Sequence, residues 1–95
     1  MNVFLTLEAE EELIVSTRFY ATQASTAIGL AFTEEVERAC RLLAEQPLIG
    51  AIWRESTRRL ALRRFPFHLM YQVHGDQIRV LAIAHQRRKP GYWRI

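Results

Sequence analysis

Residues 58–71 read RRLALRRFPFHLMY and residues 77–85 read QIRVLAIAH, and these two runs decide the fold. Apolar side chains recur at every second position, which predicts half-buried strands because successive side chains point to opposite faces of a sheet. The positions assigned to the apolar face are Leu60 and Leu62, then Phe67, Leu69, Tyr71 and Val73, then Ile78, Val80, Ala82 and Ala84. His74-Gly75-Asp76 is typical of a turn between the last two runs. We therefore predict three strands in an antiparallel meander.

The first half of the chain predicts a short strand over residues 2–5 and then two helices. Thr6 can cap the first helix, which we expect to end near Thr22, and glutamates in its first turns suit the helix dipole. Ser25 or Thr26 can cap the second helix, which Pro47 ends. We expect residues 51–57 to form an irregular connection from this helix to the sheet.

The predicted fold class is α+β, with the order β-α-α-β-β-β and an αα-hairpin packed on a small, mainly antiparallel sheet. A chain of 95 residues, 49% hydrophobic and 24% charged, is expected to form a single globular domain over residues 1–95. One cysteine, Cys40, allows no internal disulfide and no metal-ligand spacing, so we expect neither a metal nor another cofactor. The N-terminus lacks the features of a signal peptide or a membrane span, which favours the cytoplasm and no membrane partner.

The charge is divided unevenly along the chain. Residues 1–53 carry three arginines and eight glutamates, a net charge of −5. Residues 54–95 carry nine arginines and one lysine against one glutamate and one aspartate, a net charge of +8. The C-terminal half is therefore expected to face an anionic partner, such as nucleic acid or an acidic protein segment, or the acidic half of the chain itself.

An ordered set of short motifs carries a resemblance to a known family. The set is Ala9-x-x-Glu12-Leu13, the stripe Phe32, Val36, Ala39 and Leu43, Pro47-x-x-Gly50, Arg58-x-Leu60, Phe65-Pro66-Phe67-x-x-x-Tyr71 and His85-x-Arg87-Arg88-x-Pro90-x-x-Trp93. From Leu7 to Trp93 the chain resembles the RelE/ParE toxin superfamily, and the ParE branch most. The resemblance implies a β-α-α-β-β-β domain that is the toxin half of a type II toxin–antitoxin system, a class linked to plasmid stabilisation and stress responses.

Two mechanisms exist within that superfamily. RelE-like members resemble ribosome-dependent endoribonucleases, whose chemistry needs a base, an acid and cations on the scissile phosphate. ParE-like members poison DNA gyrase by binding and need no catalytic set. Potential proton-transfer groups here are His68, His85 and Tyr92. They form no clear acid–base pair, and His85 sits inside the ParE-like tail, so we favour gyrase poisoning and leave enzymatic activity open.

RNA cleavage is the alternative, and its catalytic candidates would be Arg58, Arg64, His85 and Arg87. A nucleic-acid-binding module, or an inactive scaffold that binds only the antitoxin, also stays open. The candidates for contact with a target or partner are Trp53, Arg58, Arg59, Arg63, Arg64, His85, Arg87, Arg88, Lys89 and Trp93.

Each candidate also has a purely structural interpretation. The strand arginines can be solvated or can pair with the acidic helices. His85 can be a hydrogen-bonded structural histidine, and Trp93 can cap the sheet core. Tyr71 is expected in the core with its hydroxyl at the rim, and Cys40 as a buried small hydrophobe. The resemblance implies an antitoxin as obligate partner in a hetero-oligomer, gyrase or the ribosome as target, and operator DNA contacted only through the antitoxin.

Overall fold

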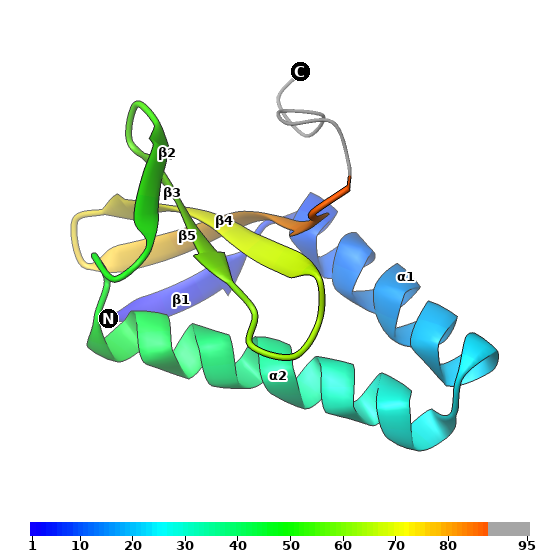
Figure 1. The fold of residues 1–95 in the computed structure, drawn as a ribbon. Coiled ribbons are helices and arrows are strands. Elements are labelled where there is room, and N and C mark those ends of the chain that lie inside the picture. The colour runs from blue at the N-terminus through cyan, green and yellow to red at the C-terminus, as the bar shows by residue number, and fades with distance from the viewer. Residues whose placement is uncertain (88–95) are drawn as a thin grey trace.

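A computed structural model describes residues 1–87 of the chain (Figure 1). Within them lie β1 (Asn2–Leu5), α1 (Leu7–Gln23), α2 (Thr26–Glu45), β2 (Ala51–Arg54), β3 (Thr57–Ala61), β4 (Phe67–His74) and β5 (Gln77–His85). The five strands form one sheet in the order β1-β5-β4-β3-β2, in which only β1 and β5 are parallel. Figure 1 shows both helices on one side of this sheet. The predicted α+β class with an αα-hairpin on a mainly antiparallel sheet is confirmed.

The helix boundaries follow the predicted capping residues. The Thr6 side chain accepts a hydrogen bond from the Ala9 amide at 3.2 Å, and the Ser25 hydroxyl accepts one from the Ile28 amide at 3.1 Å. Each cap satisfies an amide that has no partner inside the helix. The second helix ends two residues before Pro47. Gly75 adopts a φ of 60° in the turn between β4 and β5, as its place in the sequence predicts.

The core lies between the helices and the sheet and contains a cluster of aromatic rings. The Phe32 ring on α2 lies 5.1 Å from Phe65 and 5.0 Å from Phe67, measured between ring centroids. Tyr20 of α1 closes the cluster, 5.0 Å from Phe65. Such tilted and edge-to-face pairs add to the stabilisation that burial alone provides. The cluster fixes the segment between β3 and β4 against both helices.

The expectation of an irregular connection over residues 51–57 is wrong. Residues 51–54 form β2, which pairs antiparallel with β3 through a tight turn at Glu55, where φ is 49°. The register shifts between Ile52 and Arg54, so Trp53 is an extra residue in this short edge strand. A four-residue strand with a bulge shows no alternation that a sequence pattern could reveal.

A second bulge changes the predicted phase of β5. Met70 pairs with Ala82 whereas Tyr71 pairs with Val80, so Leu81 is an extra residue opposite the Met70–Tyr71 step. Before the bulge, Ile78 and Val80 face the helices.

Beyond the bulge at Leu81, the alternation of buried and exposed side chains in β5 reverses. Ile83, the partner of Leu69, joins the core cluster. The assignment of Ala82 and Ala84 to the same face as Ile78 and Val80 is therefore wrong, because the bulge turns the strand by one residue.

The start of α1 holds this bulge in place. The Thr6 amide donates to the Val80 carbonyl at 3.0 Å, and the Thr6 hydroxyl donates to the Leu81 carbonyl at 3.1 Å. Six residues further along the chain, the Glu12 carboxylate accepts from the Ile83 amide at 3.0 Å. These bonds satisfy polar groups of β5 beyond the end of β1, so α1 closes this edge of the sheet.

Candidate functional site

The loop between α2 and β2 is held by two side chains of the sheet. Tyr71 is fully buried; its hydroxyl donates to the Pro47 carbonyl at 2.8 Å and accepts from the Gly50 amide at 2.9 Å. Arg58 donates to the carbonyls of Leu48 and Gly50, at 3.2 and 2.8 Å. Burial raises the pKa of the Tyr71 hydroxyl. The hydroxyl therefore lies in the interior, not at the rim as the sequence suggested.

This loop and β2 present apolar side chains at the edge of the sheet. Leu48, Ile49 and Ile52 are all exposed, and we call them the edge patch. Beside them, the Arg54 guanidinium lies 4.4 Å from the centroid of the half-buried Trp53 ring. The predicted interface residue Trp53 thus lies at a surface that is both apolar and positively charged, a combination common at protein interfaces.

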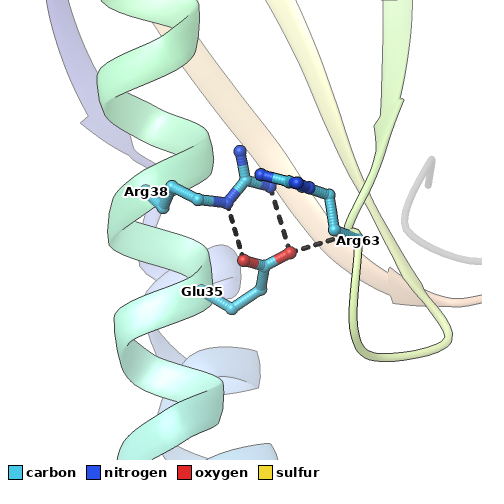
Figure 2. A network of polar contacts seen from close by, with 3 residues as sticks. All are labelled: Glu35, Arg38 and Arg63. Atoms are coloured by element: carbon cyan, nitrogen blue, oxygen red, sulfur yellow. Dashed lines mark hydrogen bonds and ion pairs between the residues drawn. The ribbon is translucent and has the colours of Figure 1, made fainter.

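The Arg63–Arg64 loop is fastened to α2 by a buried carboxylate (Figure 2). Glu35 is only 9% exposed and accepts from Nε and Nη2 of Arg38, at 2.7 and 3.0 Å, and from the backbone amide of Arg63. The hydrogen bonds from Arg38 hold the pKa of Glu35 below its usual value, although burial opposes them. The Arg64 guanidinium lies 5.7 Å from the centroid of the Phe65 ring. The predicted contact residues of this loop are therefore placed by the core and by α2.

A different face of the sheet carries Arg59 and His68. Arg59 pairs with Met70 and His68 pairs with Ala84, so both side chains lie on the side opposite the helices. Burial, and then the charge of Arg59, lower the pKa of His68. The lowered pKa favours the neutral form of His68 near pH 7. Further along the same face, Gln72 donates to the Thr57 hydroxyl at 3.0 Å.

His85 lies on the helix side of the sheet and has structural partners. It pairs with Phe67 in the β4–β5 ladder, and the two rings meet edge to face with their centroids 4.9 Å apart. Its Nδ1 accepts a hydrogen bond from the Arg87 amide at 3.0 Å, so that nitrogen carries no proton. The sheet separates His85 from His68. These two histidines therefore do not form an acid–base pair around one substrate.

Within residues 1–87, no group of three His, Cys, Asp or Glu side chains is placed to hold a metal ion. None of the described helices is long and apolar enough to cross a membrane. Cys40 is only partly buried, packed at the margin of the core, and burial raises the pKa of its thiol. An unreactive thiol is expected there.

Comparison with known proteins assigns the family. The model of the ParE toxin of type II toxin–antitoxin systems, parDE, matches residues 3–90. The chain belongs to the ParE toxin family. A solved structure of the chromosomal ParDE toxin–antitoxin system from P. aeruginosa has a similar fold, with a TM-score of 0.79 and 23% identity over 90% of this chain and 95% of that chain. No curated protein sequence matches the chain.

The ParE-family fold distributes the candidate residues over several places. Arg58 supports the α2–β2 loop, Arg59 lies on the sheet face away from the helices, and Arg63 and Arg64 lie in the β3–β4 loop. His85 and Arg87 stand together at the end of β5. Arg88, Lys89, Tyr92 and Trp93 lie outside the described residues. The strand arginines, although close in sequence, do not converge on one centre.

Other residues that shape the ParE surface were not singled out from the sequence. Glu35 falls between the core positions Phe32 and Val36 of α2, and a carboxylate on the apolar side of a helix is a signal that it has a buried partner. The edge patch gave no signal, because Leu48, Ile49 and Ile52 are neighbours in the sequence whose exposure is set by the tertiary fold. Its exposure became evident only in the structure.

Proposed function

We propose that this ParE-family protein inhibits growth by binding DNA gyrase on cleaved DNA, and that a cognate antitoxin neutralises it in the cytoplasm. The family match over residues 3–90 carries this proposal. The placement of His68 and His85 supports binding over catalysis, because these two candidate histidines lie on opposite faces of the sheet. Operator DNA is then contacted only through the antitoxin, within a toxin–antitoxin hetero-oligomer.

A gyrase cleavage assay tests the mechanism. Supercoiled plasmid is incubated with purified DNA gyrase, ATP and the protein after its release from antitoxin. Linear DNA is expected to accumulate when the reaction is stopped with detergent and protease, because a trapped complex leaves both strands cut. Normally supercoiled plasmid at a large molar excess of folded protein would contradict gyrase poisoning. Ribosome-bound mRNA would then be the substrate to test, and His85 the first residue to replace.

Removal of residues 88–95 is expected to reduce gyrase-dependent cleavage at least about tenfold, the loss that follows from roughly 1.4 kcal/mol of binding free energy. These residues include Arg88, Lys89 and Trp93, the densest group of cationic and aromatic candidates. The truncation keeps Gln86, whose amide donates to the Pro66 carbonyl at 2.9 Å, and Arg87, whose amide donates to His85. The measurement is the fraction of linear plasmid, with thermal unfolding as the control for an intact fold. A folded truncation with undiminished cleavage would remove the tail from the gyrase contact.

We propose that the basic surfaces around Arg59 and Arg64 bind an acidic, amphipathic segment of the antitoxin. Arg64→Glu is expected to weaken antitoxin binding about tenfold, since reversing a charge both removes an attraction and adds a repulsion. Arg59→Glu tests the opposite sheet face in the same way. Arg58 is a poor choice, because its replacement also removes the hydrogen bonds that hold the α2–β2 loop.

The affinity is measured by titration calorimetry with the cognate antitoxin. Arg41→Glu is the matched control: it makes the same change in net charge at an exposed site on α2. Equal losses for Arg41→Glu and Arg64→Glu would mean that only net charge matters. Unchanged affinity for the Arg59→Glu/Arg64→Glu double variant would place the antitoxin elsewhere.

A further inference from the structure

Helix α1 carries apolar side chains on two sides, and only one side is buried. Ala9, Leu13 and Tyr20 face the core. A second set is exposed to solvent: Leu7 by 67%, Ile14 by 50%, Val15 by 65% and Phe19 by 59%. Single exposed apolar residues are ordinary, but four large ones on one helix indicate an interaction site.

The second set forms one stripe along the helix. Its members are spaced seven, eight and twelve residues from Leu7, and such spacings return to the same side of a helix with 3.6 residues per turn. Glu11 and Arg18 fall on the same side, between the apolar residues, and both are exposed. We call these six residues the outer stripe of α1.

We propose that a second copy of this chain covers the outer stripe, with the two α1 helices packed antiparallel about a twofold axis. An axis that passes between Ile14 and Val15 places Ile14 of one copy against Val15 of the other, because each residue faces the one equally far beyond the axis. The same operation places Glu11 opposite Arg18, since Glu11 lies three residues before Ile14 and Arg18 lies three residues after Val15. The interface therefore has an apolar centre with an ion pair on each side.

The charges of the stripe favour this occupant. The first turns of α1 carry Glu8, Glu10 and Glu11, whereas Arg18 is the basic residue towards its other end. Antiparallel packing brings the acidic end of each helix to the arginine of its partner, while a parallel pair would bring the acidic ends together. The central part of the stripe, from Glu11 to Arg18, is thus complementary to itself, whereas a site for a uniformly acidic or basic partner would carry charges of one sign.

The area of the outer stripe determines how tightly the dimer is expected to bind. One helix pair covers less than the roughly 800 Å² per partner that is usual in stable complexes, so the dimer should be weak and micromolar. The dimer would also leave the other surfaces accessible. Figure 1 shows β2 and α1 at opposite ends of the molecule, so the edge patch stays free. The proposal does not depend on gyrase or on an antitoxin.

Sedimentation velocity of the free protein, between about 1 and about 300 µM, tests self-association over the range expected for a weak interface. The wild-type chain is expected to shift from monomer to dimer with rising concentration. Val15→Glu should weaken the dimer at least tenfold, because it places two carboxylates beside the axis. Ile52→Glu is the matched control: it removes an equally exposed apolar side chain from β2, and its dimer should match that of the wild type.

A charge exchange tests the antiparallel arrangement itself. Arg18→Glu alone is expected to weaken the dimer at least threefold, because it places Glu11 opposite a second carboxylate. The Glu11→Arg/Arg18→Glu double variant restores opposite charges and should regain wild-type association. Monomer at every concentration would overturn the proposal and leave the stripe to another partner. A dimer that Val15→Glu does not weaken, or an exchange that does not restore association, would also overturn it.

Discussion

Gly50→Ala is expected to destabilise the protein by about 3 kcal/mol, at the upper end of the cost of overpacking a filled interior. An added Cβ at this position would lie 2.6 Å from the Tyr71 hydroxyl oxygen, 2.7 Å from Tyr71 Cε1 and 2.8 Å from the Arg59 carbonyl oxygen. Tyr71 is fully buried and Arg59 contributes backbone of a central ladder, so neither can move freely. The measurement is urea unfolding, compared with the wild type.

A double-mutant cycle identifies the clash as the cause. Tyr71→Phe alone is expected to cost about 1–2 kcal/mol, because it leaves the buried Pro47 carbonyl and Gly50 amide without their partner. In the Gly50→Ala background the same change also removes one of the clashing atoms. The double variant should therefore lose less stability than the sum of the two single losses. If the free energy of unfolding of Gly50→Ala lay within about 0.5 kcal/mol of the wild-type value, the α2–β2 loop could shift at little cost and the clash would not be the cause.

Glu35→Ala is expected to cost about 2–3 kcal/mol near neutral pH. The carboxylate accepts from Arg38 and from the Arg63 amide, and its removal leaves both without that acceptor. The estimate lies below that for a fully buried ion pair, because the Arg38 side chain is 29% exposed and can be hydrated. Glu34→Ala, an exposed neighbour on α2, is the control and should change stability little.

The pH dependence of the Glu35 contribution follows from the sign of its shift. The folded pKa lies below the usual value of 4.5, so the folded state binds the proton less readily than the unfolded state. The carboxylate therefore contributes its full stability above about pH 4.5, and the contribution decreases as the pH falls through the folded pKa. Thermal unfolding should show the gap between wild type and Glu35→Ala narrowing in acid. A gap that stays constant down to pH 2 would contradict this account.

Much of the fold could be predicted from local signals. Thr6 and Ser25 cap helices because their hydroxyls satisfy free amides, and Pro47 stops α2, which are local effects visible in the sequence. β2 and the extra residue Leu81 could not be found in that way. Their positions depend on which strands are neighbours, and therefore on contacts between distant parts of the chain.

The candidate site was less predictable than the fold. The sequence shows where cations are concentrated along the chain, but not that the Arg58 guanidinium donates to two backbone carbonyls. Neighbouring arginines of one strand point to opposite faces, so a dense basic run does not become a dense basic surface. Whether Arg59, Arg64 and the tail contact a partner stays a prediction.

The pairing of the first and last strands has a consequence for synthesis of the chain. Within the sheet β1 pairs with β5 alone, and the Thr6–Leu81 bond spans 75 positions of the sequence. Contacts of such long separation slow folding, because a large loop must close before they form. On the ribosome, β1 and the start of α1 must wait without their partner until β5 has left the exit tunnel. A nascent chain released early would therefore lack a closed sheet, and nascent chains are expected to become protease-resistant only after β5 has emerged from the ribosome.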